Sequence, residues 1–199
     1  MATMNLQPAA NADDGYGHSS GPTFDASSTT AFFGNNSLVQ QGFIRFTLDA
    51  DLTGATIDTA VLTIYVDAQG AGNTETTLRL NDADDAAAPT TWSALDGLTL
   101  TTAGQFWDIT TSAEEDKVSP DFAAVIQEYV DSYTAANGDH ITVVLDCSTS
   151  AVEAAREFHT LESTQEAPRL AITYTPAAVG GDHSLVVDLN SRQFIREVR

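Results

Sequence analysis

Two runs of alternating apolar and polar residues, GFIRFTL at 42–48 and TAVLTIYV at 59–66, constrain the fold of this chain most. In the first run Ile44 and Phe46 share one face of an extended chain, because successive side chains of a β-strand point to opposite sides. The second run is apolar on both faces, which is typical of a strand that is central in its sheet. DADLTGA between them predicts a turn. Long leucine- and lysine-rich helices are absent, so the sequence predicts an all-β scaffold.

The remainder of the chain predicts further strands and one helix. The segments expected to be extended are TETTLRLND, LTLTTAGQFWDIT, HITVVLDC, AREFHTLE and PRLAITYT, together with a short edge strand in MNLQP. We interpret ADDGYGHSSG and FGNNS as loops, because glycine and asparagine tolerate positive φ. Apolar residues at helical spacing predict an amphipathic helix over about 120–134, with Ser119 as its cap and Pro120 in its first turn.

The charge is strongly acidic, with 28 acidic against 8 basic residues, a net charge of −20 and a single lysine, Lys117. Such a field repels nucleic-acid phosphates and anionic membrane surfaces, so neither is an expected partner. No run is long enough to span a bilayer, and we expect no membrane insertion. Two interpretations of the charge stay open. One is an ordinary solubilising surface, and the other is adaptation to high salt, where screening removes self-repulsion.

Catalytic signatures are missing from the sequence. The four histidines are scattered, and neither a nucleophile elbow nor a phosphate-binding glycine loop is present. Acidic residues are plentiful, but nothing in the sequence places two of them across a cleft. The single cysteine, Cys147, lies in an apolar run, which indicates a buried thiol and excludes an intrachain disulfide. We therefore expect a protein that is not an enzyme and requires no cofactor.

Calcium is the inorganic ligand that the sequence suggests most. The NDADD segment offers hard oxygen donors on a predicted loop, which are Asn81, Asp82, Asp84 and Asp85. It lacks the glycine and the closing glutamate of an EF-hand, so a solvated acidic loop is the competing interpretation. Asp13 and Asp14 form a second, weaker pair of candidate ligands.

Aromatic residues in predicted loops are candidates for stacking on the apolar faces of sugar rings. Trp92 lies in a long polar loop and is expected to be an exposed ring, and Tyr16 is the second candidate. Trp107 is expected to belong to the core, because it begins an alternating run. The competing interpretation for each ring is local packing.

The C-terminal segment, 176–199, begins with a linker rich in proline and glycine and ends in SLVVDLNSRQFIREVR. This end is amphipathic and carries three of the arginines, so we expect it to dock on an acidic neighbour, such as a second copy of the chain. The residues expected to make assembly contacts are Arg192, Phe194, Arg196 and Arg199. Packing of this tail on its own domain is the alternative.

Several of these segments together resemble a known family. GFIRFTL runs into GATIDTAVLTIYV, WDIT precedes the helix FAAVIQEYV, and NGDHITVVL, REFHTLEST and APRLAITYT follow. This spacing resembles the DNRLRE domain, also called disaggregatase-related, over about residues 5–175. The resemblance implies a jelly-roll-type β-sandwich like those of carbohydrate-binding modules, which occur in secreted or surface proteins and in some cases bind polysaccharide. From the sequence we expect the chain to depart from that pattern in three ways: a tail after Thr175, no export signal and no attached catalytic domain.

From these observations we expect a jelly-roll-type sandwich over 1–175 and a docking tail over 176–199. The hypothesis that follows is a non-enzymatic structural protein of a virus particle, made in the host cytoplasm without a signal peptide. Such a protein would be a capsid decoration, turret or tail-fibre component of a tailed virus that infects a salt-loving host. It would also contact glycans on the surface of that host. It would form a homo-oligomer and contact other virion proteins. The alternative is a carbohydrate-binding module that recognises a cell-surface polysaccharide.

Overall fold

The computed structural model describes residues 1–20, 23–67, 73–110, 114–150 and 154–178. The assembly residues expected in the tail, Arg192, Phe194, Arg196 and Arg199, lie outside the described residues. Within the described residues the chain forms strands and two helices, in the order β1 (Ala2–Leu6), β2 (Asp14–His18), β3 (Thr23–Asp25), β4 (Thr30–Asn35), β5 (Val39–Thr47), β6 (Thr56–Val66), β7 (Thr74–Leu80), α1 (Trp92–Asp96), β8 (Gln105–Ile109), β9 (Glu115–Val118), α2 (Ala123–Ser132), β10 (His140–Asp146), β11 (Ala154–His159) and β12 (Arg169–Thr175).

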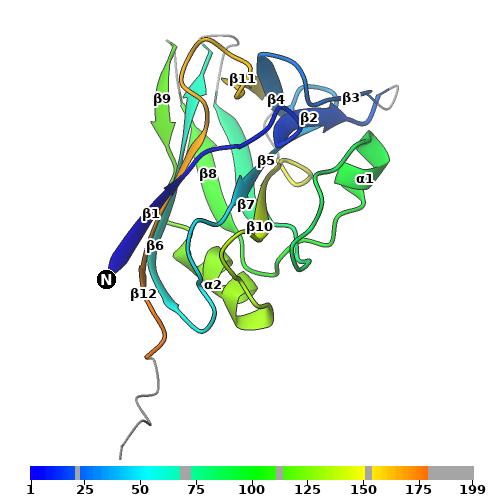
Figure 1. Ribbon diagram of the computed structural model, residues 1–199. Helices are drawn as coiled ribbons and strands as arrows, with labels where there is room; N and C mark the ends of the chain where they lie inside the picture. Colours follow the sequence, from blue (N-terminus) through cyan, green and yellow to red (C-terminus); the bar gives the residue numbers. More distant parts are fainter. Residues whose placement is uncertain (21–22, 68–72, 111–113, 151–153, 179–199) are drawn as a thin grey trace, which may run out of the picture.

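The strands form two layers that face one another, and every pairing is antiparallel. One layer has the order β1-β12-β6-β9, and Figure 1 shows these strands together along one side. The other layer has the order β2-β5-β10-β7-β8, with β3 added beside β2. β6 has a partner on each edge, which confirms the central position predicted from its two apolar faces. The all-β sandwich expected from the sequence is therefore the observed architecture.

A two-stranded ribbon made of β4 and β11 joins the two layers at one end. The ribbon pairs with β6 through Phe158 and Val66, and with β5 through Gly34 and Gln40. The core lies between the layers and consists of every second residue along the strands, where the side chain points inward. Fully buried examples are Ile44, Phe46, Leu62, Ile64, Val143 and Phe158. Burial of these side chains is the main force that holds the two layers together.

Helix α2 lies at the opposite end of the sandwich from β9 (Figure 1) and is shorter than predicted. The prediction that Ser119 caps it was wrong. The Ser119 hydroxyl instead accepts a hydrogen bond from the Leu62 amide at 3.0 Å and donates to the Pro120 carbonyl. Asp121 accepts from the amides of Ala123 and Ala60, so this segment satisfies the edge of β6 before the helix begins. No helix in the described part of the chain is long and apolar enough to cross a bilayer.

Two segments predicted to be loops near the N-terminus belong to strands: ADDGYGHSSG contains β2, and FGNNS contains the end of β4. These strands lack an alternating hydrophobic pattern, because glycine occupies positions where two backbone segments approach closely. A Cβ at Gly15, where φ is +157°, would lie 2.8 Å from Ala26 Cα, so a side chain cannot fit. The strands are consequently set by contacts with distant segments rather than by their own side chains.

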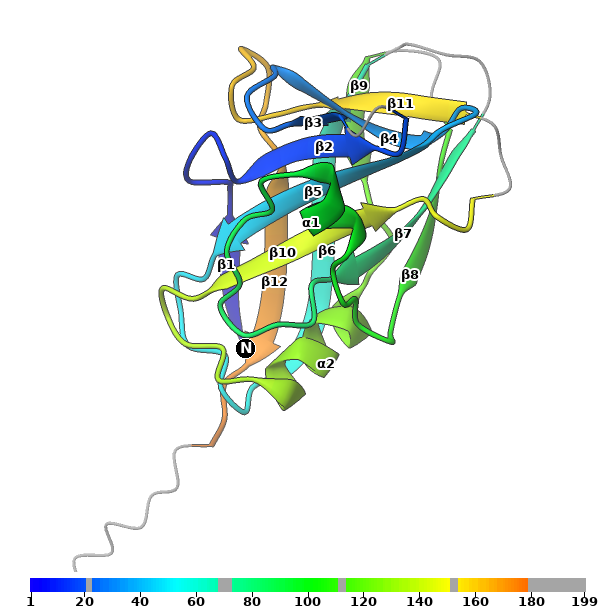
Figure 2. The same cartoon turned by 90° about the vertical axis from the view of Figure 1, so that its right-hand side faces the viewer.

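The segment between β7 and β8 covers the outer face of β5 and β10, as Figure 2 shows from the side of α1. It carries helix α1, which the sequence did not predict. Thr91 caps that helix by accepting from the Ala94 amide at 3.1 Å. Behind the segment, Phe24 stacks on Phe43 with ring centroids 5.6 Å apart. One face of the sandwich is therefore covered by a second, smaller apolar layer.

Candidate functional site

Trp92, expected to be an exposed ring, is only 9% exposed. It occupies the first position of α1, and the Thr91 cap turns its ring onto β2. A Cβ at Gly17 would lie 2.7 Å from Trp92 Cε3, so the glycine is what admits the indole. The expectation of exposure was wrong because a short capped helix, rather than an open loop, holds the residue. Trp92 still lines a surface hollow of about 460 Å³ together with Phe24 and Thr90.

Tyr16, the second ring predicted to contact sugar, is packed among other rings in β2. Its ring meets Phe32 edge-on at 5.0 Å and stacks on His18 at 6.4 Å. Burial raises the pKa of the Tyr16 hydroxyl above its usual value, with the carboxylates of Asp25 and Glu157 adding to the shift. Because these rings pack against Tyr16, its ring is not a free platform on which a sugar could stack.

The predicted calcium loop is engaged in protein contacts instead. Asp82 accepts a hydrogen bond from the Tyr133 hydroxyl at 3.1 Å, and Asp85 Oδ1 lies 2.6 Å from His140 Nδ1. Asn81 is buried and forms an isolated bridge to Leu100. Within the described residues, no group of three or more histidine, cysteine, aspartate or glutamate side chains is placed to hold a metal ion. The structure therefore does not bring Asp82, Asp84 and Asp85 together as a cation site.

Phe106, which the sequence analysis did not single out, is the exposed aromatic ring of the described chain. It is 54% exposed on the edge strand β8, whereas its neighbour Trp107 is buried as predicted. The contrast follows from strand geometry, because adjacent residues point to opposite faces and Trp107 points into the core. Phe106 pairs with Thr77 of β7 across the ladder. A single exposed apolar ring is common on protein surfaces, so the meaning of Phe106 depends on the groups that lie beside it.

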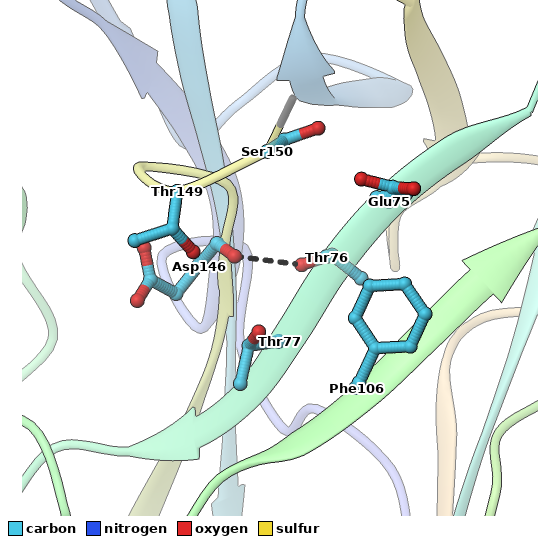
Figure 3. A pocket seen from close by; sticks show the side chains of 7 residues that line it. All are labelled: Glu75, Thr76, Thr77, Phe106, Asp146, Thr149 and Ser150. Atoms are coloured by element: carbon cyan, nitrogen blue, oxygen red, sulfur yellow. Dashed lines mark hydrogen bonds between the residues drawn. The ribbon is translucent and has the colours of Figure 1, made fainter. Parts of the chain in front are cut away.

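Hydroxyl and carboxylate groups line a hollow beside this ring, and Figure 3 shows the side chains that form it. The residues that line the hollow are Glu75, Thr76 and Thr77 of β7, Phe106 of β8, and Asp146, Thr149 and Ser150 at the end of β10. The Thr76 hydroxyl donates to the Asp146 carbonyl at 3.3 Å. The hollow measures about 30 Å³, which is room for a water molecule or one hydroxyl group rather than for a whole sugar ring.

Arg79 links Asp146, which lines the hollow, to the segment that precedes β8. Its guanidinium lies 3.6 Å from the Asp146 carboxylate and donates to the carbonyls of Thr101 and Thr102 at 2.5 and 2.9 Å. Gly104 makes room for these contacts, since a Cβ there would lie 2.7 Å from the Thr77 methyl group. Glu75, Thr77 and Asp146 are thus held by the sheet, which favours preorganised binding, whereas Thr149 and Ser150 lie in the turn that follows β10.

A comparison with protein families identifies the relationship. The profile of carbohydrate-binding module family 96 matches residues 6–174, which is most of the chain. The chain belongs to carbohydrate-binding module family 96. The expected likeness to a carbohydrate-binding sandwich is confirmed, although the match does not carry the DNRLRE name. No curated protein matches the sequence significantly.

Within this family 96 module, a second hollow lies on the open face of the other layer. It measures about 420 Å³ and is lined by Asn5, Leu6, Gln7, Thr63, Arg169 and Ala171. Arg169 forms ion pairs there with Glu166 and, at 2.8 Å, with Asp116. The arginine is therefore already neutralised, and none of the lining residues is aromatic. The surface around Phe106 combines a free ring with hydrogen-bonding groups, which this hollow does not.

Proposed function

We propose that the module binds polysaccharide on the Phe106 platform, defined as Phe106 with Glu75, Thr77, Asp146 and the hydroxyls of Thr149 and Ser150. The observation that carries the proposal is an exposed ring, flanked by hydroxyl and carboxylate groups, in a member of a carbohydrate-binding family. Sugar rings present an apolar C–H face and a polar rim. An aromatic ring and nearby hydrogen-bonding groups match both parts.

Stacking on Phe106 supplies a moderate share of the affinity. Covering about 60 Å² of apolar surface at about 25 cal/mol per Å² stabilises the complex by about 1.5 kcal/mol, or about tenfold in the dissociation constant. Hydrogen bonds to the carboxylates then orient the sugar, and the small hollow beside the ring accepts one hydroxyl group or the water that replaces it.

An uncharged polysaccharide is the ligand class that this surface favours. Glu75, Asp146 and the nearby Asp108, which pairs with Glu75 across the ladder, are acidic, and the whole chain carries a net charge of −20. A polyanion would meet repulsion at this surface, whereas a neutral chain can donate hydrogen bonds from its hydroxyl groups without that penalty. Carboxylate acceptors are also well suited to the hydroxyl donors of a neutral sugar.

The test is a comparison of Phe106→Ala with the wild-type chain on a panel of soluble neutral and acidic polysaccharides. Affinity electrophoresis selects the ligand, and titration calorimetry then measures its dissociation constant. We expect binding to a neutral polysaccharide that Phe106→Ala weakens by about tenfold, the value worked out from the buried ring area. Val118→Ala is the matched control, because Val118 is 59% exposed on β9 of the other layer.

Equal weakening in Phe106→Ala and Val118→Ala would contradict the platform, because it would reflect a general loss of apolar surface. Retention of full affinity in Phe106→Ala would move the binding site elsewhere, and Arg169→Ala would then test the second hollow. Preference for acidic polysaccharide would contradict the ligand class. Circular dichroism and thermal unfolding of both variants would confirm that the fold is intact before binding is compared.

The virion role, the homo-oligomer and the extracellular-particle localisation stay predictions. The family match supports the alternative hypothesis, carbohydrate binding, more than it supports a structural role in a virus. The two are compatible if a particle protein attaches to host glycans. Sedimentation of the full chain beside a chain truncated after residue 176 tests the assembly role of the tail, and identical monomers would contradict it.

A further inference from the structure

Two carboxylate side chains are enclosed without the partners that buried charges require. Asp14, the first residue of β2, is 0% exposed. Its Oδ2 accepts a hydrogen bond from the Leu161 amide at 2.9 Å, but its Oδ1 has no hydrogen-bond partner among the described residues. Leaving a buried carboxylate oxygen unpaired is strongly unfavourable, so this atom calls for a ligand or a proton.

Glu162 supplies the second carboxylate. Both of its oxygens are enclosed and lack a hydrogen-bond partner within the described chain. The Leu161 amide that binds Asp14 belongs to the residue immediately before Glu162, which places the two acids beside one another. Burial, opposed by the Leu161 hydrogen bond and assisted by the nearby charges of Glu162 and Asp13, raises the pKa of Asp14 to about 7. The charges that act on Asp14 are those of the two acids Glu162 and Asp13, so like charges repel at this site.

The neighbouring Asp13 shows how this chain satisfies a buried acid when it uses protein groups alone. Asp13 Oδ1 lies 2.7 Å from Arg45 Nη1, and its Oδ2 accepts from the amides of Ala9 and Ala10 at 3.3 and 3.0 Å. The arginine thus serves Asp13, and the oxygens of Asp14 and Glu162 remain unpaired. A bound cation would neutralise Asp14 and Glu162 in the way that Arg45 neutralises Asp13.

We propose that Asp14 and Glu162 bind a calcium ion between the start of β2 and the connection from β11 to β12. Carboxylate oxygens are the ligands that Ca²⁺ prefers, and its flexible shell of six to eight oxygens admits backbone carbonyls and water beside the two acids. Mg²⁺ requires a stricter octahedron and releases its water reluctantly, so it fits less well. The ion neutralises the two acids and fastens β2 to the β11–β12 connection, which stabilises the sandwich independently of sugar binding.

The experiment measures calcium binding by the full chain after chelation, in about 1 M NaCl, where diffuse attraction to the acidic surface is screened within about 3 Å. Titration calorimetry gives the stoichiometry, and thermal unfolding gives stability. We expect one Ca²⁺ per chain and a rise in Tm of about 5–10 °C at a hundredfold excess over Kd. Mg²⁺ at the same concentration should give a smaller rise.

Three variants separate this site from the acidic surface as a whole. Asp14→Asn and Glu162→Gln should each abolish the calcium-dependent rise in Tm, and Asp84→Asn, in the loop first considered for calcium, should retain it. Glu162→Gln keeps the test decisive if Asp14→Asn fails to fold. The proposal is overturned if wild-type protein gains no stability from Ca²⁺, if Glu162→Gln keeps the full rise, or if all three variants lose it equally. Polysaccharide binding is measured separately, so its failure leaves this result distinct.

Discussion

Replacing Gly34 with alanine tests how the two layers are joined. Gly34 lies in β4 with φ at +127°, where it pairs with Ala155 of β11 and with Gln40 of β5. A Cβ at this position would lie 2.6 Å from Ala155 Cα and closer still to the Ala154 carbonyl oxygen. These are backbone atoms, so no rotamer change relieves the overlap. The ribbon must open or shift to accept the methyl group.

Two effects add in Gly34→Ala. The left-handed backbone disfavours any side chain by about 1–2 kcal/mol. The forced separation of β4 from β11 adds about 1–3 kcal/mol, as overpacking of a tight interior does. We therefore expect the free energy of unfolding to fall by about 2–5 kcal/mol, a large part of the 5–15 kcal/mol typical of a domain.

Urea unfolding followed by circular dichroism measures this loss, and Gly138→Ala is the matched control. Gly138 also has a positive φ, +97°, but a Cβ there would meet nothing within 4 Å. The control should therefore lose only the backbone contribution of about 1–2 kcal/mol. The reasoning fails if the two variants lose equal stability, since the contact with β11 would then contribute nothing. An unchanged Gly34→Ala would refute the placement of β4 against β11.

Two further outcomes follow from buried polar groups. Burial raises the pKa of the Cys147 thiol to about 12; iodoacetamide at pH 8 should therefore leave the native protein unmodified and label it fully in guanidinium, whereas rapid native labelling would contradict the burial. Arg45→Met removes the cation that lies 2.7 Å from Asp13, and we expect a loss of about 2–4 kcal/mol in urea unfolding. Adding Asp13→Asn to that variant should recover part of the loss, and no recovery would show that the pair is not coupled.

Strands could be predicted from the sequence where their own side chains form an apolar or alternating pattern that matches their burial. β5 and β6 alternate or are apolar throughout, and their positions followed directly from that pattern. β2 and β4 could not be recognised in this way, because Gly15 and Gly34 fit against backbone that lies far away in the sequence. The short strand β9, with the sequence EDKV, is set by its pairing with β6 rather than by hydrophobicity. Such contacts are decided by the tertiary fold.

The candidate sites divide along the same line. Alternation placed Trp107 in the core and should also have placed Phe106 outside, so the platform was within reach of sequence reasoning. Trp92 was misjudged because a five-residue helix with a threonine cap is a weak local signal. The proximity of Asp14 to the connection that carries Glu162 depends on a long-range contact, because the Leu161 amide that binds Asp14 lies 147 residues away in the sequence. No local pattern could reveal it.

The pairing of β1 with β12 has a mechanical consequence. Ala2 lies opposite Tyr174, so residues near the start and the end of the described domain sit side by side in one ladder. A load applied between these two points would break the hydrogen bonds of that ladder one after another, from the loaded end inward, rather than stretching them all at once. Under tension between these two points, β1 should consequently detach from β12 before the rest of the layer around β6 yields.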